Sequence, residues 1–274
     1  MNEGNFLAEI LTRRRRRVAA ESGASTPTAM RGRARRARET KSPHRLQDAL
    51  EANDGVNIIG EFKRASPSRG PIRSDVDLAD IIRRYEAAGV CAVSVLTEPD
   101  YFRGSIDDLR RARAVTELPI LRKDFIVDEY QIYEAAEEGA DAILLIVAAL
   151  TDRDLARFRT LAGDELGLDV LVEVHTGEEM QRAANCGAKL IGVNNRDLRT
   201  FATSLETSVQ LAALAPTGAT LISESGISSS ADIARLSQCG FRGFLIGEAL
   251  MRSADASALI RSLRSVESEE ARNV

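Results

Sequence analysis

Eight short apolar runs recur along the chain from Val56 onward, separated by stretches with helical spacing. They read VNIIGEFK, CAVSVLTE, LPILRKD, DAILLIVAAL, DVLVEVH, KLIGVNN, ATLISESG and GFLIGEA. Each run has the length of a strand and is rich in Val, Ile and Leu without alternation, as is typical of parallel strands buried on both faces. The pattern predicts an α/β protein, a (β/α)8 TIM barrel over residues 49–274.

The same spacing predicts where the elements lie. Strands are expected at 56–62, 91–96, 119–123, 141–147, 169–174, 189–194, 219–223 and 243–246. Helices are expected at 77–88, 105–115, 129–138, 152–165, 177–186, 204–214, 229–238 and near 255–266. Gly89, Gly139, Gly187 and Gly240 follow four of these helices, where glycine suits the left-handed end of a helix.

Residues 1–48 precede the barrel and are predicted to form a helical, Arg-rich extension. Apolar residues recur at helical spacing between Phe6 and Val18, which predicts a short amphipathic helix. We expect this helix to lie over the barrel mouth with its apolar side packed inward and its arginines solvated. A breaker segment at 22–29 separates it from a further helical pattern at 42–52.

The formal net charge of −4 conceals an asymmetry, since residues 1–45 hold twelve Arg and Lys against four Glu. Arg13 to Arg17 form an unbroken run, and five more arginines cluster between Arg31 and Arg38. Such blocks either bind nucleic acid or form a solvated helical face. Because no aromatic residues interleave with them and no nucleic-acid module is recognisable, we expect no nucleic-acid partner.

The composition favours a cytoplasmic protein. Three cysteines, Cys91, Cys186 and Cys239, lie far apart, and an odd number argues against a disulfide framework. No apolar stretch reaches the roughly 18 residues of a membrane span, and no secretory signal is recognisable. We expect a monomer that acts away from membranes.

Seven of the eight runs end on residues that can do chemistry or hold an anion, and in this fold the active site lies at those strand ends. Glu61 and Lys63 end the first run on one face of the strand, which points them into the barrel mouth. A buried ion pair is the alternative interpretation of these two residues. Lys123 ends the third run and either acts as a general acid or neutralises Glu61 or Glu173.

Glu173 and Asn194 complete a ring of acid, base and hydrogen-bonding groups, and Arg196 can add a bidentate contact to an anion. The loop ASPSRG after the first run contains Ser66 and has the composition of a substrate-binding loop. His175 follows Glu173 by two residues but has no evident partner nearby in sequence, so we interpret it as structural.

SESGI and IGEAL follow the seventh and eighth runs, where this fold often binds phosphate through backbone N–H groups and a short helix. Gly226 and Gly247 would let the backbone approach the ligand closely. We expect a phosphate monoester at Gly226, Gly247 and Glu248. Glu224 is expected to contact the substrate, and Ser225 to serve in catalysis.

These motifs together resemble those of the indole-3-glycerol phosphate synthase family. The matching stretches are IIGEFKRASPSRGPI, VSVLTEPDYFRGS, PILRKDFIVDEYQIYEA, LVEVHTGEEM, IGVNNRDLRTF, LISESGI and FLIGEALMR. They run through almost the whole barrel in the family's order. The Arg-rich stretches before residue 42 match least well, although the family commonly has a helical extension there that helps to cover the substrate.

The resemblance implies conversion of 1-(2-carboxyphenylamino)-1-deoxyribulose 5-phosphate to indole-3-glycerol phosphate, carbon dioxide and water, without cofactor or metal. By similarity, Lys123 is the acid at the substrate carbonyl, and Lys63 binds the carboxylate or acts as a second acid. Glu173 is the base, with Glu61 assisting. The residues that would orient the substrate are Asn194, Arg196 and Ser225.

Two other interpretations predict different residues. A phosphoribosylanthranilate isomerase, another phosphate-binding barrel, has a cysteine at the end of the first strand, where this chain has Glu61 and Lys63. A barrel retained as a nucleic-acid or protein-binding module would show decay of the polar strand ends. These ends are intact, which favours the enzyme.

Overall fold

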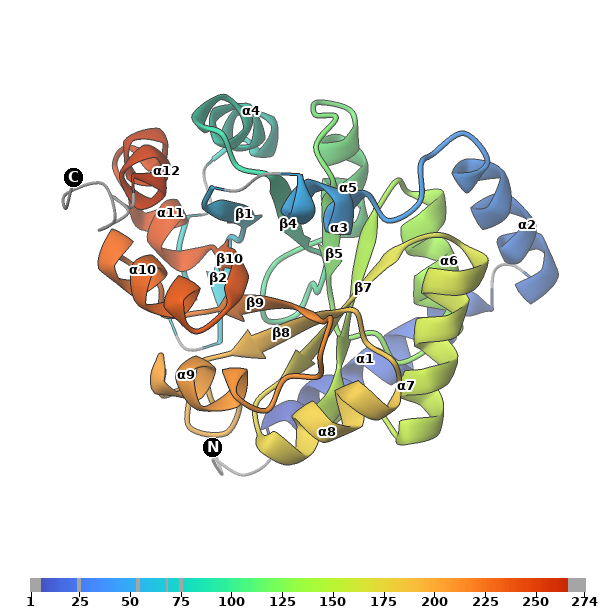
Figure 1. Cartoon of the computed structure of the whole chain (residues 1–274). Helices are drawn as coiled ribbons and strands as arrows, with labels where there is room; N and C mark the ends of the chain where they lie inside the picture. Colours follow the sequence, from blue (N-terminus) through green and yellow to red (C-terminus); the bar gives the residue numbers. More distant parts are fainter. Residues whose placement is uncertain (1–5, 24–25, 53–54, 68, 74–75, 266–274) are drawn as a thin grey trace.

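The computed structural model describes residues 6–23, 26–52, 55–67, 69–73 and 76–265. Eight parallel strands close into a barrel in the order β1-β10-β9-β8-β7-β6-β5-β4 (Figure 1). They are β1 (Asn57–Phe62), β4 (Ala92–Leu96), β5 (Ile120–Lys123), β6 (Ala142–Ile146), β7 (Asp169–Val174), β8 (Leu190–Asn194), β9 (Thr220–Glu224) and β10 (Phe241–Ile246). The strands follow one another around the barrel in chain order, which confirms the predicted fold.

Helices surround the barrel and alternate with its strands. They are α4 (Leu78–Ala88), α5 (Ile106–Arg113), α6 (Glu129–Glu137), α7 (Asp152–Arg159), α8 (Gly177–Asn185), α9 (Glu206–Ala212), α10 (Ser230–Gln238) and α12 (Ala256–Arg264). Several begin at a side chain that accepts a backbone N–H of the first turn, such as Asp77, Ser105 and Thr176. Every helix that the structure describes is too short or too polar to cross a membrane.

Several short elements were not predicted, because two to six residues give no clear periodic pattern. They are the antiparallel pair β2 (Ala65–Ser66) and β3 (Gly70–Pro71), the 3-10 turn η1 (Val147–Ala149), the π-helical segment η2 (Thr160–Glu165) and α11 (Glu248–Arg252). Helix α7 therefore ends at Arg159, earlier than predicted. Ser68 of the ASPSRG loop and residue 266 of the predicted last helix lie outside the described residues.

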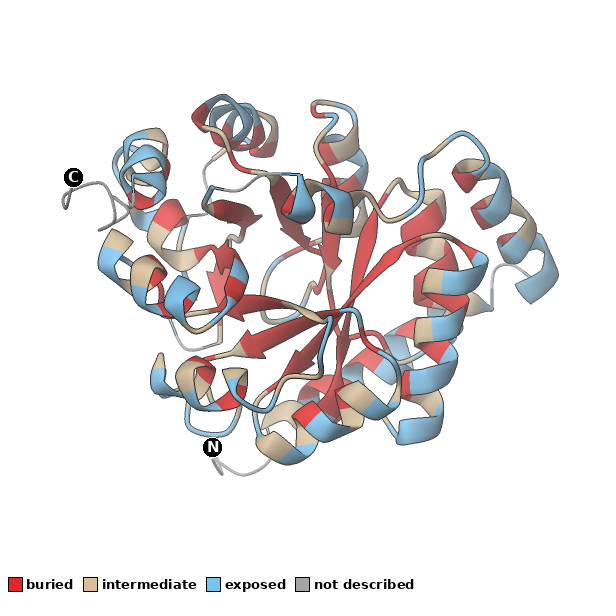
Figure 2. Ribbon diagram, viewed as in Figure 1, coloured by how far each residue is buried: buried red, intermediate tan, exposed pale blue. Residues whose placement is uncertain are grey.

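Apolar side chains pack in two layers, one between the strands and the surrounding helices and one inside the barrel. The strands themselves are buried almost throughout (Figure 2). Adjacent residues of a strand point to opposite sides. Ile58 accordingly joins the layer between strands and helices, whereas Ile59 joins the cluster inside the barrel with Leu121 and Leu171. Burial on both faces explains why the strand sequences are apolar without alternation.

The extension consists of α1 (Phe6–Ser22), α2 (Pro27–Arg38) and α3 (Arg45–Glu51). Ile10 of α1 and Leu46 and Leu50 of α3 belong to the cluster inside the barrel. The first turn of α3 is held by Asp169 at the start of β7, whose carboxylate accepts the N–H of Leu46 at 2.7 Å. Helix α3 therefore closes the end of the barrel where the strands begin, while α1 lies at the opposite end and α2 packs against α6 (Figure 1).

The prediction that the arginines of the extension are solvated is wrong for Arg14 and Arg38, which are buried. Ile10, Arg14 and Val18 are spaced by four residues and share the buried side of α1, so an unbroken run of arginines must place one of them there. Arg38 donates hydrogen bonds to the carbonyl oxygens of Ala140, Leu166 and Gly167.

Arg14 anchors α1 to the residue that follows Lys123. Its Nε and Nη2 atoms donate to the two carboxylate oxygens of Asp124 at 3.1 and 2.7 Å. Asp124 also accepts the Thr97 hydroxyl at 2.7 Å and pairs with Arg122 at 3.1 Å. Burial alone would raise the pKa of Asp124, but Arg14, Arg122 and Thr97 hold it below its usual range.

We predict that Arg14→Gln lowers the free energy of unfolding by about 3 kcal/mol, because it takes a partner from a buried carboxylate. Arg15→Gln, on the exposed side of the same helix, should change it by less than about 0.5 kcal/mol. Denaturant unfolding followed by circular dichroism measures both values. Equal effects of the two substitutions would contradict the buried pair.

Candidate active site

The C-terminal ends of the strands surround a cavity of about 690 Å³. Phe6, Leu7 and Ile10 of α1 form part of its wall, which confirms the predicted position of this helix over the barrel mouth. The predicted site residues all line this one cavity: Glu61, Lys63, Ser66, Lys123, Glu173, Asn194, Arg196, Glu224, Ser225, Gly226, Gly247 and Glu248. The structure therefore brings together in space residues from five strands and the loops that follow them.

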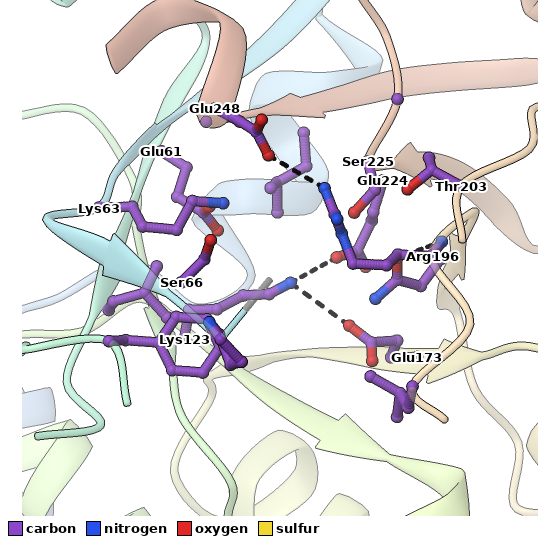
Figure 3. Close-up of a pocket in the computed structure, with 18 of the residues that line it drawn as sticks. Glu61, Lys63, Ser66, Lys123, Glu173, Arg196, Thr203, Glu224, Ser225 and Glu248 are labelled. Atoms are coloured by element: carbon purple, nitrogen blue, oxygen red, sulfur yellow. Dashed lines mark hydrogen bonds and ion pairs between the residues drawn. The ribbon is translucent and has the colours of Figure 1, made fainter. Parts of the chain in front are cut away.

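Lys123 lies between two carboxylates that reach it from across the barrel (Figure 3). Its Nζ atom is 2.5 Å from Oε2 of Glu224 and 3.3 Å from Oε2 of Glu173. Both glutamates are almost completely buried. A buried cation shared by two anions has a fixed position, and the third ammonium hydrogen is available to a ligand in the cavity.

Glu61 and Lys63 lie at the end of β1 and form an ion pair, with Nζ 2.8 Å from Oε1. Both line the cavity, as period-two geometry predicts for residues that share a strand face. The pair is thus both a buried ion pair and part of the cavity wall. The two interpretations that the sequence left open are compatible.

The charges of this cluster determine the protonation states of its members. Burial lowers the pKa of Lys123, but Glu224, Glu173 and Glu61 outweigh it and raise the pKa well above its usual value. Burial raises the pKa of Glu173, but Lys123, His175 and Asn194 outweigh it and lower the pKa. Burial raises the pKa of Glu224 to about 7. At neutral pH the cluster therefore holds a protonated lysine beside an ionised Glu173.

The loops after β8, β9 and β10 form another side of the cavity. Arg196 Nη2 lies 3.0 Å from Oε2 of Glu248, and Arg69 Nε lies 3.2 Å from its Oε1. Ser225 and Gly226 adopt left-handed backbone conformations, with φ of 68° and 82°. The turn after β9 lines the same cavity as the two guanidinium groups that pair with Glu248.

The two glycines of these turns are required by packing inside the protein. A Cβ atom at Gly226 would lie 2.7 Å from Cγ2 of Thr203, and the positive φ disfavours any other residue. A Cβ atom at Gly247 would collide with the side chain of Glu61. Room for Glu61 and the shape of the turn therefore account for these glycines independently of a bound anion.

Asn195 supports the turn after β9 and was not predicted. Its Nδ2 donates to the carbonyl oxygen of Ser225 at 3.0 Å, and its Oδ1 accepts the N–H of Ser208 at 3.1 Å. It is buried and does not line the cavity. In sequence it is one of two adjacent asparagines, and only strand alternation separates the supporting residue from Asn194.

Apolar side chains form a further wall of the cavity, and the sequence analysis did not identify them. They are Leu96, Phe102, Phe125, Leu144 and Ile146, together with the residues of α1. Phe102 and Phe125 lie with ring centroids 6.3 Å apart. Such a wall suits a flat aromatic group, but in a sequence these residues look like any other part of the core.

His175, interpreted from the sequence as structural, lies against the active-site cluster. Its Nε2 is 3.5 Å from Oε1 of Glu173, and its Nδ1 is 3.2 Å from Oε2 of Glu179. The acidic partner that seemed to be absent is therefore Glu179, four residues on, in the first turn of α8. His175 does not line the cavity. Arg122 is buried and points away from the barrel interior to Glu134.

The fold is shared with enzymes of very different sequence. A thiamine phosphate pyrophosphorylase from Pyrococcus furiosus superposes with a TM-score of 0.59 at 16% identity, over 81% of this chain and 96% of that one. A mandelate oxidase bound to benzoyl-formic acid superposes with a TM-score of 0.55 at 18% identity, over 69% of this chain and 68% of that one. Identities this low establish the barrel and leave its chemistry open.

Closer relatives share both the barrel and the sequence. An indole-3-glycerol phosphate synthase from Koribacter versatilis is 46% identical over 94% of this chain and 98% of its own length. One from Lachnoclostridium phytofermentans is 49% identical over 80% of each chain. The family model described as indole-3-glycerol phosphate synthase matches residues 7–263. The chain therefore belongs to the indole-3-glycerol phosphate synthase family.

Proposed function

We propose that the cavity over the barrel carries out the family's reaction through its two lysines and its buried glutamates. Membership of the family makes the chain a carbon–carbon lyase of tryptophan biosynthesis. The reaction closes the ring of 1-(2-carboxyphenylamino)-1-deoxyribulose 5-phosphate and releases carbon dioxide and water. The observation that carries the proposal is the Lys123 ammonium, held between Glu173 and Glu224 at the cavity wall.

The shape and charge of the cavity support this substrate. The apolar wall formed by Phe102, Phe125 and Leu144 suits the aromatic ring. The turns after β9 and β10, with Arg196, suit the phosphate. Glu248 already pairs with Arg196 and Arg69. We propose that phosphate takes over these arginines and that Glu248 contributes through its backbone N–H.

Ring closure needs a proton at the carbonyl oxygen as the aryl carbon attacks it. We propose that Lys123 gives this proton, because its carboxylate neighbours keep it charged at neutral pH. Lys63 binds the substrate carboxylate or acts as the second acid when the new hydroxyl leaves as water. Glu173 removes a proton from the CH2 carbon beside the nitrogen after the new ring has closed, and Glu61 assists.

The remaining residues of the wall fix the substrate between these groups. Asn194 interacts with Glu173 and accepts the backbone N–H of Arg196 at 3.0 Å, so it links the base to the phosphate side of the cavity. We propose that Ser225 and Ser66 orient the substrate by hydrogen bonds. Glu224 holds Lys123 in place. These steps use protein groups alone as proton donors and acceptors.

The setting of the enzyme is likewise proposed. We infer a monomer that acts in the cytoplasm. We also infer that it binds no nucleic acid, since Arg14 and Arg38 of the basic extension are buried inside the protein. Helix α3 runs across the boundary set between residues 48 and 49 and fills the barrel end. The boundary between extension and barrel therefore cuts through one helix, and we propose that the two parts fold as one unit.

Production of the indole chromophore from the carboxyphenylamino substrate, followed by ultraviolet absorbance or fluorescence, tests the proposed function. We predict that Lys123→Arg lowers kcat by about 10²- to 10⁴-fold, because guanidinium keeps the charge but is a poor acid at neutral pH. Glu173→Gln should lower kcat by a similar factor, with the shape of the side chain retained. Wild-type turnover in either variant would remove that residue from the mechanism.

Arg196→Gln is predicted to raise KM by about 10- to 100-fold. This factor corresponds to the binding free energy of one or two charge-assisted hydrogen bonds to phosphate. The dephosphorylated substrate is the matched control. It should bind weakly to the wild type, and the substitution should leave its affinity unchanged. An equal loss for both substrates would place the contribution of Arg196 elsewhere.

Glu224 gives a prediction for stability. Burial raises its pKa to about 7, above the 4.5 of the unfolded chain. The contribution of Glu224 to the free energy of unfolding is therefore complete below pH 4.5 and is lost as the pH rises through 7. Relative to Glu224→Gln, the wild type should lose about 2–3 kcal/mol between pH 5 and pH 8. Denaturant unfolding at both values measures this difference. A difference independent of pH would contradict the raised pKa.

A further inference from the structure

His175 occupies a position between the active-site cluster and the outer surface. It follows β7, and Glu179 belongs to α8 on the outside of the barrel. Side-chain exposure rises along the series, from 3% for Glu173 to 11% for His175 and 17% for Glu179. The three residues form a continuous file of titratable groups that begins beside the cavity and ends at solvent.

The Nε2 atom of His175 is buried and makes no hydrogen bond among the residues that the structure describes. It is aimed at Oε1 of Glu173 at 3.5 Å, slightly beyond a hydrogen bond. The other nitrogen is fixed by Glu179, which accepts from Nδ1 at 3.2 Å and from the backbone N–H at 2.7 Å. A buried polar atom without a partner costs about 1–3 kcal/mol, which calls for an explanation beyond packing.

The proposed reaction consumes one proton per turnover, which this file of residues can supply. The carbonyl oxygen takes one proton as the new C–C bond forms, and the hydroxyl takes a second as its C–O bond breaks and water leaves. Loss of carbon dioxide breaks a C–C bond and consumes no proton. Only one proton returns, when a C–H bond breaks and Glu173 accepts it. Each turnover therefore takes one proton from water. Because the bound substrate fills the cavity, this proton must reach the lysines from another side.

We propose that His175 delivers this proton from solvent to the active-site cluster by way of Glu173. The Nε2–H bond of the imidazolium breaks as an O–H bond forms at Oε1 of Glu173. Rotation of the protonated carboxyl group about its Cγ–Cδ bond exchanges the two oxygens and turns the O–H toward Lys123, whose Nζ lies 3.3 Å from Oε2 in the structure. The O–H bond then breaks as an N–H bond forms on the neutral amine. The imidazole regains a proton from water beside Glu179. His175 is thus a positioning residue that acts through Glu173, and the inference rests on the proposed function.

The charges around His175 favour its imidazolium form. Glu173 of β7, Glu179 of α8 and Glu224 of β9 face it, and Lys123 of β5 lies beyond Glu173. Burial lowers the pKa of His175, but these carboxylates outweigh it and raise the pKa above its usual value. Delivery of the proton should therefore persist at neutral pH and fail as the pH rises through the pKa of His175.

Steady-state kinetics across a pH series with the carboxyphenylamino substrate test the relay. His175→Gln keeps a hydrogen-bond donor near Nε2 but cannot exchange protons, so kcat should fall at least about tenfold with KM and the melting temperature unchanged. The alkaline fall of kcat that we predict for the wild type should be absent from this variant. Added imidazole should restore kcat in His175→Ala, whereas sodium chloride at equal ionic strength should not.

His44→Gln is the matched control, because His44 is the other of the two histidines in the chain. It lies at the opposite end of the barrel, 3.3 Å from Asp169, and its substitution should leave the pH profile unchanged. Wild-type kcat and pH profile in His175→Gln would overturn the relay and leave the proposed function intact. A loss of kcat that accompanies a lower melting temperature and resists imidazole would also overturn it. Absence of indole product from the wild type would overturn both proposals.

Discussion

The active site depends on one interaction, the attraction between the Lys123 ammonium and the carboxylates of Glu173 and Glu224. Each of these groups would be costly alone in the barrel interior, and together they are tolerated. The same attraction assigns their chemistry, since it keeps Lys123 protonated and Glu173 ionised. An acid and a base can therefore coexist a hydrogen-bond length apart without neutralising each other before the substrate arrives.

The rest of the molecule holds this cluster in place from both ends of the barrel. Leu46 and Leu50 of α3 fill the end where the strands begin, and the apolar side of α1 covers the other end. Arg14 binds Asp124, the direct neighbour of Lys123, so the covering helix and the proposed acid share one strand end. The position of the lid and the position of the lysine are thus set by the same short segment.

The sequence predicted the barrel well because both faces of its strands are buried, and burial on both faces leaves a plain apolar signal. It predicted Glu61, Lys63, Lys123 and Glu173 because charge is rare in such strands. It did not predict the apolar wall around Phe102, since substrate-facing and core residues have the same chemistry. The prediction of solvated arginines was wrong for Arg14 because its partner Asp124 is 110 positions away in the chain, and a local pattern does not contain that information. His175 stays outside the cavity, as interpreted from the sequence. Its partner Glu179 is only four residues on, at helical spacing.

The pair between Arg14 and Asp124 joins residues 110 positions apart in the chain. During synthesis α1 is made before the other helices that the structure describes, yet Asp124 and α6, against which it packs, are made only after more than a hundred further residues. Its apolar side, with Ile10 and Leu11, therefore stays in water while most of the first half of the barrel is translated. Arg13, Arg15 and Arg16 beside it are exposed in the finished protein and stay hydrated throughout, whereas Arg14 gains its buried partner only when Asp124 has been made.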